Sequence, residues 1–466
     1  MENTKGERNS FTGSIGFVLA AAGSAVGLGN IWRFPYFAAK DGGGLFLVIY
    51  LILALTFGFA LLATEIAIGR KTKESPLTAY KKLNKKWAFL GVFSFVIPLI
   101  IYPYYCVLGG WVTKYMVTYI TWHGADAVNP DYFNAFTKNI WQPILFMAIY
   151  SAASFYIVFR GVEKGIEKFS KILMPILVVI IVFISIYTLT IKTTDSNGVT
   201  RTGIQGLSYY IIPSLKGITV RKFLSVCLDA MGQLFYSLSI AMGIMIAFGS
   251  YMKKEVSIVK SVNRIALFDT LIAFFAGLMI IPAVYVFKGE GGMTRGASLM
   301  FVSLPEIFNS LGAFGNVIGI IFFVMVLFAA LTSSVSILEA IVSSMIDKFK
   351  WSRKKASVIM AAFTFVISVI VCLGFNVFYF EANLPGVTKG QLLDVLDYIS
   401  NNILMPVTSL LTCILVGWVC KTQMMVDEIA LNGEKFRRRG LYVVMVKYIA
   451  PVLLFILLLT SFGVFG

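Results

Sequence analysis

Residues 20–36 read AAAGSAVGLGNIWRFPY, and they interrupt an apolar run that begins near Ser14 with three glycines, an asparagine, an arginine and a proline. Each glycine weakens a helix by about 1 kcal/mol relative to alanine. Inside a membrane, unwound backbone survives only where protein, ions or water satisfy its N–H and C=O groups. The stretch therefore predicts a membrane helix with a break at its centre.

Such a break can bind ligands through the main chain. Freed carbonyls can replace the hydration shell of a cation, and N–H groups at the start of the next half-helix face an anion. Gly27 and Gly29 also lack the Cβ atoms that would hold a ligand away. We hypothesise a cation site beside a carboxylate site. The alternative is a small-residue face for helix packing, but Asn30 and Arg33 count against it, because polar groups at membrane depth tend to be functional.

The composition of the whole chain indicates an all-α polytopic membrane protein. The 466 residues are 58% hydrophobic and 14% charged, with a mean hydropathy of +0.83, whereas soluble chains are about 45–50% apolar and about 25% charged. The apolar residues form stretches long enough to cross a bilayer as helices. We predict eleven spans, at 14–38, 42–69, 87–121, 141–159, 166–190, 224–251, 261–287, 313–346, 356–379, 391–420 and 441–464.

The net charge of +17 is distributed unevenly between the loops. The N-terminus and the loops joining even to odd spans hold twenty-four lysines and arginines, and the opposite loops hold ten. This asymmetry predicts a multi-pass protein of the cell membrane with a cytoplasmic N-terminus and an external C-terminus. It also explains the basic balance without a nucleic-acid partner. The sequence has a single histidine, in a predicted external loop, and all five cysteines lie within spans. We see no nucleophile–base pair or metal cluster, so we predict that the protein is not an enzyme.

The interruption in span 1 has a counterpart in span 6, where residues 235–243 read FYSLSIAMG. Broken helices at corresponding places of two halves point to the binding site of a transporter. We predict a single domain, 1–466, in which a five-helix repeat at 14–190 is followed by an inverted repeat at 224–420, with 441–464 as an additional span. We also expect short helices in the connection 191–223, and another in MFVSLPEIF (300–308), folded over an external vestibule.

Several ordered motifs resemble the neurotransmitter:sodium symporter family. They are GSAVGLGNIWRFPY followed by DGGG at 41–44, YPYYCVLGGW in span 3, GVEKGIEKFSKILMP at span 5, GQLFYSLSIAMG in span 6 and FAALTSSVSILE in span 8. Eleven spans are similar to the bacterial amino-acid transporter branch of that family. The resemblance implies a leucine-transporter-like fold and sodium-coupled symport of an amino acid into the cell by alternating access.

The resemblance implies two sodium sites. The first would use Ala25, Asn30, Ser237 and Asp269, and the second would use Gly23, Val26, Ala329, Thr332 and Ser333. All offer hard oxygen donors, which suit an alkali cation, and the last three residues share one helix face. The alternative for Thr332 and Ser333 is hydrogen bonding between helices.

Asp269 departs from the family pattern, in which asparagine is usual. An unpaired carboxylate in the middle of span 7 costs about 2.5 to 3.5 kcal/mol, and a bound cation would offset that cost. The resemblance implies that animal relatives with the neutral amide need chloride to balance charge. Because Asp269 supplies a fixed negative charge, we expect transport without chloride.

The resemblance also implies the substrate. Gly27 stands where carriers of amines have an aspartate, which favours an amino acid that brings its own carboxylate. Tyr105, Leu28 and Gly29 would bind that carboxylate, and the carbonyls of Ala25, Tyr236 and Ser237 the ammonium. The side-chain pocket would comprise Ile101, Tyr236, Ser239, Met242 and Ile337. We expect a large hydrophobic or aromatic side chain, partly because methionine adapts to irregular apolar groups.

Two gates complete the implied mechanism. The outer gate would pair Arg33 with Asp397 above Tyr105 and Tyr236, and the inner gate would use Arg8, Phe11, Tyr251 and Asp347. We further expect Glu65 and Glu339 to support unwound backbone. Two alternatives stay open: a passive channel or receptor on the same scaffold, and a proton-coupled or exchange amino-acid transporter in which Asp269 titrates.

Overall fold

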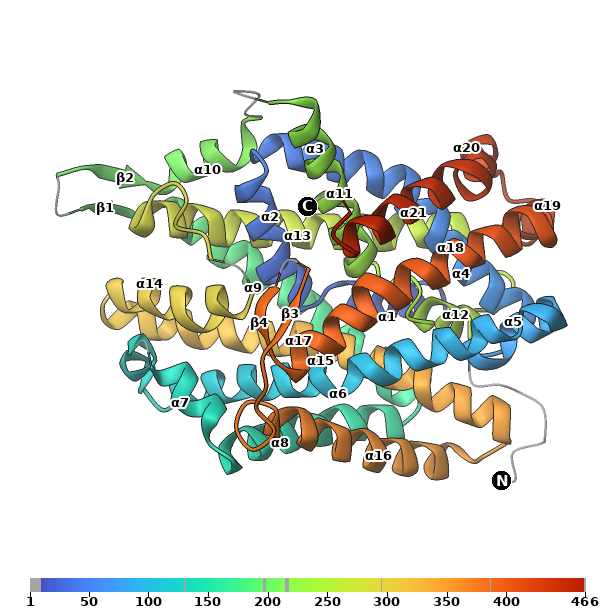
Figure 1. Ribbon diagram of the computed structural model, residues 1–466, viewed down its shortest axis with the longest axis horizontal. Coiled ribbons are helices and arrows are strands. Elements are labelled where there is room, and N and C mark those ends of the chain that lie inside the picture. The colour runs from blue at the N-terminus through green and yellow to red at the C-terminus, as the bar shows by residue number, and fades with distance from the viewer. Residues whose placement is uncertain are drawn as a thin grey trace.

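The computed structural model describes residues 10–129, 131–195, 198–213, 218–294, 296–385 and 387–464. Most helices run along the long axis of the molecule (Figure 1). At one end lie α7 (Tyr132–Lys138), α14 (Leu304–Ser310) and the hairpin of β1 (Lys192–Thr194) and β2 (Thr200–Thr202). At the other end lie α5 (Pro76–Leu83) and α19 (Gln423–Ile429). The first end is the one that the charge pattern predicts to be external.

Within the described residues, nine continuous helices are long and apolar enough to cross a membrane. They are Gly44–Thr72 (containing α3, Gly44–Leu53, and α4, Phe59–Thr72), Lys85–Ile120 (α6, Phe89–Ile120), α8 (Trp141–Phe159), Val162–Leu189 (α9, Lys168–Leu189), α13 (Ile258–Lys288), α15 (Ala313–Phe349), α16 (Arg353–Leu373), Leu392–Val419 (α17, Leu392–Asp397, and α18, Met405–Ile414) and Arg439–Ser461 (α20, Arg439–Val444, and α21, Ala450–Ser461).

A tenth span is bent, as the opening stretch of sequence predicted. Helix α1 (Ser14–Ala25) meets the helix Gly29–Lys40, which contains α2 (Phe34–Lys40), at 53°. Residues 26–28 between them are not helical apart from the start of the next turn at Leu28. The all-α membrane fold is thereby confirmed.

The predicted sixth span is likewise two helices, α11 (Val220–Ser237) and α12 (Ile244–Ser250). Residues 238–243 between them contain left-handed backbone at Ser239 (φ 54°), Ala241 (φ 67°) and Gly243 (φ 70°). A non-glycine residue in this region costs about 1–2 kcal/mol, so packing must hold the turn in place. Counting α11 and α12 as one span would give the predicted eleven, and that count and the inverted halves stay predictions.

Close packing fixes α12 against α4. A Cβ atom on Gly69 would lie 2.0 Å from the Ile246 carbonyl oxygen, and one on Gly249 would lie 2.5 Å from that of Ile66. Only glycine permits this approach, because real Cβ contacts are longer. The second half of span 6 is therefore anchored to span 2, while the turn at 238–243 faces α1.

The expected short connecting helices are present. Helix α10 (Gly203–Ile211) begins with a capping box formed by Thr202 and Gln205, a common N-terminal signature. MFVSLPEIF forms a π-helical turn, Leu299–Ser303, that continues into α14. A second antiparallel hairpin, β3 (Ala382–Leu384) with β4 (Val387–Gly390), precedes α17.

Candidate functional site

A small chamber lies between the two helix breaks. Its volume is about 20 Å³, and a single water needs roughly 10–15 Å³ on the same scale. Ser24, Asn30 and Ser333 contribute to its wall. The wall also contains every residue predicted to touch the substrate: Ala25, Gly27, Leu28, Gly29, Ile101, Tyr105, Tyr236, Ser237, Ser239, Met242 and Ile337.

The glycines of span 1 face this chamber closely. A Cβ atom on Gly27 would lie 2.8 Å from Ser333 Oγ and 3.0 Å from the Tyr105 hydroxyl, and one on Gly29 would lie 2.6 Å from a ring carbon of Tyr236. The Leu28 N–H donates to the Tyr105 hydroxyl over 3.5 Å. The main chain of the break is thus the surface that a bound molecule would meet.

Asp269 is fully buried at one edge of the chamber and accepts three hydrogen bonds. Oδ1 accepts from Ser237 Oγ at 2.5 Å and from Asn30 Nδ2 at 2.8 Å, and Oδ2 accepts from the Tyr50 hydroxyl at 2.9 Å. All three donors are neutral, and no lysine or arginine of the described residues forms an ion pair with Asp269. Charge-assisted hydrogen bonds stabilise an ionised group by about 1.5–3 kcal/mol each, so three donors stabilise a negative charge here.

Three of the four residues predicted for the first sodium site meet at this carboxylate. Asn30 Oδ1 accepts from the Gly27 N–H at 3.1 Å, and Asn30 Nδ2 also lies 3.0 Å from Ser237 Oγ. Asn30, Ser237 and Asp269 are in mutual contact, and Ala25 lies in the same chamber. Carboxylate, amide and hydroxyl oxygens fit a hard cation.

A second oxygen cluster lies where α15 crosses the end of α1. Ser333 Oγ is 3.3 Å from the Gly23 carbonyl, 3.2 Å from that of Ser24 and 3.0 Å from that of Val26. A hydroxyl has one proton and can serve one of these acceptors at a time. The alternative for Ser333, a hydrogen bond between helices, is thus present in the structure. The cluster nevertheless holds more acceptors than donors, which fits a cation. Thr332 Oγ1 donates to the Ala329 carbonyl at 3.0 Å in the same turn of α15.

Two polar side chains, Gln233 and Glu65, support the breaks, and the sequence analysis singled out only the second. Gln233 Nε2 donates to the freed Gly29 carbonyl at 3.1 Å. Glu65 Oε1 accepts from the Ala241 N–H at 2.6 Å, which confirms its expected support of unwound backbone. The same expectation for Glu339 was wrong, because that carboxylate binds Arg353 at 2.7 and 2.8 Å and the Tyr251 hydroxyl at 2.7 Å.

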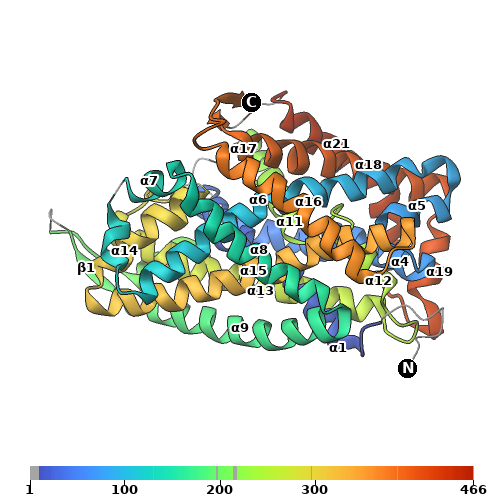
Figure 2. The same cartoon turned by 90° about the horizontal axis from the view of Figure 1, so that it is seen from below.

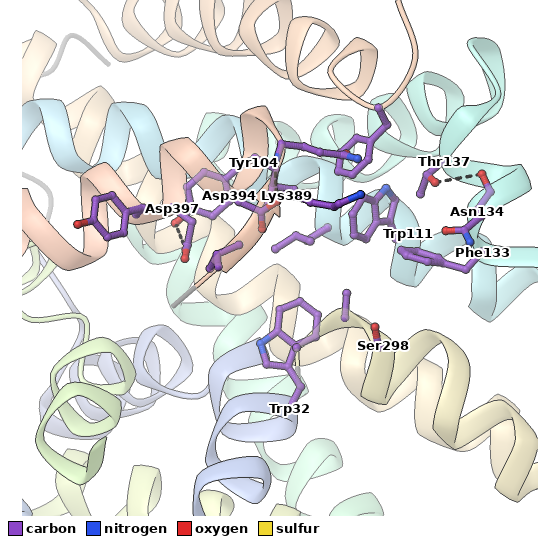
Figure 3. Close-up of a pocket in the computed structure, with 18 of the residues that line it drawn as sticks. Trp32, Tyr104, Trp111, Phe133, Asn134, Thr137, Ser298, Lys389, Asp394 and Asp397 are labelled. Atoms are coloured by element: carbon purple, nitrogen blue, oxygen red, sulfur yellow. Dashed lines mark hydrogen bonds between the residues drawn. The ribbon is translucent and has the colours of Figure 1, made fainter. Parts of the chain in front are cut away.

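A larger cavity of about 1550 Å³ opens towards the predicted external end. Its wall includes Trp32 of the helix Gly29–Lys40, Tyr104 and Trp111 of α6, and Asp397 of α17 (Figure 3). Tyr236 lines both this cavity and the small chamber, so its ring separates the two.

The predicted outer gate residues lie along this cavity. The Arg33 guanidinium lies 5.3 Å from the Tyr236 ring centroid and 5.5 Å from that of Phe37. Asp397 Oδ1 accepts from the Tyr104 hydroxyl at 3.1 Å and from Asn401 Nδ2 at 2.5 Å. Arg33 and Asp397 thus both line the wall of this cavity. Tyr104 is a partner of the Asp397 carboxylate that the sequence analysis did not foresee.

The predicted inner gate is partly described. The Phe11 N–H donates to the Tyr251 carbonyl at 3.3 Å, and the two rings are 6.4 Å apart. Asp347 Oδ2 accepts from the Ser75 N–H at 2.7 Å. Arg8 lies outside the described residues.

Two ion pairs join the outer halves of the broken helices. Lys222 of α11 lies 2.9 Å from Asp41, which follows α2, and Lys40 of α2 lies 2.7 Å from Asp229 of α11. Asp41 Oδ2 is buried and has no hydrogen-bond partner among the described residues. Burial raises the pKa of the Asp41 carboxyl to about 6, although the hydrogen bond from Lys222 opposes the rise.

Two broken helices around a small chamber, with buried oxygen clusters and a second cavity on one side, define a secondary transporter rather than an enzyme. The model of the Sodium:neurotransmitter symporter family matches residues 8–135 and 138–465. The chain belongs to this family, as its motifs predicted, and it is a multi-pass, sodium-dependent symporter.

Individual relatives agree with this assignment. The chain is 31% identical to an uncharacterized sodium-dependent transporter of Bacillus subtilis, YhdH, over 97% of both chains. It is 24% identical to the human sodium- and chloride-dependent GABA transporter 2, over 91% of this chain and 75% of that protein. The crystal structure of MhsT in complex with L-phenylalanine is similar in fold, with a TM-score of 0.83 and 32% identity over 98% of this chain and 100% of that one.

Proposed function

We propose that this protein is a sodium-coupled symporter that carries a large hydrophobic or aromatic amino acid into the cell by alternating access, without chloride. The observation that carries the proposal is the convergence of all eleven predicted substrate residues on one chamber beside two oxygen clusters. The similar MhsT structure contains L-phenylalanine, which supports an aromatic substrate class.

The substrate's charged groups would bind the main chain of the breaks. Its carboxylate would accept from the N–H groups of Leu28 and Gly29 and from Tyr105, and its ammonium would donate to the carbonyls of Ala25, Tyr236 and Ser237. Ile101, Met242 and Ile337 supply an apolar wall for the side chain. Because the chamber holds about 20 Å³, the Tyr236 ring must move to admit an amino acid.

Two sodium ions would bind, one among Ala25, Asn30, Ser237 and Asp269, and the other among Gly23, Val26, Ala329, Thr332 and Ser333. The substrate carboxylate would complete the first site, so each ligand raises the affinity for the other. One sodium ion gains about 2.3 kcal/mol per 100 mV and about 1.4 kcal/mol per tenfold gradient. Two ions then supply roughly 7 kcal/mol, which is enough for concentrative uptake.

The gates would operate from opposite sides of the cell membrane. With the N-terminus in the cytoplasm and the C-terminus outside, Arg33, Asp397 and Tyr236 close the outer path. Arg8, Phe11, Tyr251 and Asp347 close the inner path.

Uptake by purified protein in liposomes tests the proposal. Radiolabelled phenylalanine, tyrosine, tryptophan and leucine are each offered with an inward sodium gradient, with sodium equal on both sides, and with an inward proton gradient alone. We expect accumulation above the external concentration only with the sodium gradient. Flux that merely equilibrates would favour a channel, and accumulation driven by protons alone would favour the proton-coupled alternative.

A further inference from the structure

The junction of the last two predicted spans carries a cluster of unpaired cations. We call it the basic patch, and it consists of Lys421, Lys435, Arg437, Arg438, Arg439 and Lys447. In the described part of the chain, no carboxylate forms an ion pair with any of these six residues. Basic residues that cluster at the end of a membrane helix attract anionic lipid headgroups.

The side chains that bind Arg438 and Arg439 are neutral. Arg438 lies 3.8 Å from the Phe59 ring centroid and donates to the Leu55 carbonyl at 3.2 Å and to the side chain of Asn263. Arg439 donates to Gln423 Oε1 at 2.9 Å. These contacts orient the guanidinium groups without supplying a counter-charge.

Lys447 extends the patch into the membrane-crossing helix itself. It is the only charged residue between positions 440 and 461. Its helix, Arg439–Ser461, lies at the edge of the bundle, where α21 packs beside α18 (Figure 2). Only 22% of the most apolar part of that helix is buried, the smallest share among the nine continuous helices of the described residues. An ammonium group at such a position is costly unless it finds a partner or reaches the interface.

Two aromatic rings hold the Lys447 ammonium. Its nitrogen lies 4.7 Å from the Trp418 ring centroid and 5.4 Å from that of Tyr448. Trp418 Nε1 donates to the Lys447 carbonyl at 3.1 Å, and the two rings are 55% and 50% exposed. Tryptophan and tyrosine favour the headgroup level of a bilayer, so this lysine is presented where lipid phosphates lie.

The backbone is adapted at the same place. Leu415–Val419 and Met445–Ile449 are both π-helical turns, and they contact each other. A Cβ atom on Gly417 would lie 3.3 Å from Lys447 Cα, so the helices approach closely there. Widened turns of this kind often occur at functional sites.

We propose that the basic patch binds the phosphate of an anionic phospholipid headgroup, with Lys447 reaching it from between Trp418 and Tyr448. The position favours a lipid over a soluble macromolecule, because Lys447 lies on an apolar helix that faces the bilayer. Of the other five cations, Lys435, Arg437, Arg438 and Arg439 lie at the start of that helix, and Lys421 follows the preceding span, Leu392–Val419.

Native mass spectrometry of the purified full-length protein in detergent tests the proposal without requiring transport. Phosphatidylglycerol is titrated against phosphatidylcholine of the same chains, and then against inorganic phosphate. We expect preferential binding of phosphatidylglycerol. Lys447→Gln should weaken it about fivefold, because a basic residue near an anionic lipid surface contributes about 1 kcal/mol. Adding Arg439→Gln should weaken it about 25-fold in total.

The control variants separate charge from packing. Lys447→Arg keeps the charge and should retain binding, and Lys192→Gln, on β1 at the opposite end, should leave it unchanged. Equal binding of the two lipids, or wild-type affinity in Lys447→Gln, would overturn the proposal. So would loss of binding in Lys447→Arg, or displacement of the lipid by inorganic phosphate.

Discussion

Asp269→Asn removes a charge while keeping the shape of the proposed first sodium site. The three hydrogen bonds to the carboxylate, at 2.5, 2.8 and 2.9 Å, can persist, because an amide oxygen accepts from Ser237 and Asn30 while the Tyr50 hydroxyl turns to accept from the new NH₂ group. The variant should therefore fold. What it loses is the negative charge that stabilises a neighbouring cation.

The size of the effect follows from Coulomb's law. Two unit charges about 4 Å apart interact by roughly 4 kcal/mol at an effective dielectric constant of about 20, which sets an upper limit near 1000-fold. Desolvation and rearrangement reduce this value. We expect the sodium concentration for half-maximal uptake to rise between tenfold and several-hundredfold in chloride-free buffer, and added chloride to restore part of the loss.

The assay is sodium-dependent uptake into liposomes, with chloride or gluconate as the external anion. Wild-type uptake should be the same in both, and Asp427→Asn, an exposed carboxylate on α19, should behave like the wild type. Unchanged sodium dependence of Asp269→Asn in gluconate would refute the charge argument. Wild-type uptake that fails in gluconate would refute chloride independence.

Three further variants probe the chamber, the second oxygen cluster and the ion pairs between the outer halves of the broken helices. Gly27→Ala places a methyl group 2.8 Å from Ser333 Oγ, so uptake should fall at least tenfold while thermal stability holds. Gly440→Ala, with open space around it, should transport normally. Normal uptake in Gly27→Ala would contradict the close approach. Ser333→Ala removes the hydroxyl shared by three carbonyls, so sodium affinity should fall about tenfold. The control is Ser368→Ala, which removes another buried hydroxyl, in span 9. An equal loss of sodium affinity in that control would assign the effect to packing. The third variant, Asp41→Asn, tests a pKa that burial raises to about 6 from an ordinary value of about 3.9. Between about pH 6 and pH 4 the folded protein binds a proton at Asp41 that the unfolded chain does not bind. This group therefore favours the folded state increasingly as pH falls through that window. Thermal unfolding should therefore show a smaller gain on acidification in Asp41→Asn than in the wild type, and identical pH profiles would contradict the raised pKa.

Features with a local signal were predictable from the sequence. Glycines and polar residues interrupt apolar runs at 23–30 and 235–243, and the structure breaks both helices there. The short apolar stretch MFVSLPEIF likewise became a helical segment. In each case the controlling forces, backbone propensity and desolvation, act within about ten residues.

Partners brought together from distant spans were not predictable in this way. Tyr50 and Gln233 are single polar residues within helices, and no local pattern distinguishes them from packing residues. Glu339 was assigned to unwound backbone, but the start of the next helix brings Arg353 to it at 2.7 Å. The pairing of Tyr104, rather than Tyr105, with Asp397 depends on how span 10 leans on span 3.

Residue types and their order alone determined that this chain crosses a membrane many times and exposes main-chain oxygens at two interruptions. The tertiary structure alone decided which donors meet those oxygens: Ser237, Asn30 and Tyr50 around Asp269, and Ser333 among three carbonyls of α1. The physical reason is that the free energy of transfer from water into the membrane is a property of each residue by itself, so the sequence is enough to predict it. A hydrogen bond needs two groups within about 3 Å, and only packing sets that distance.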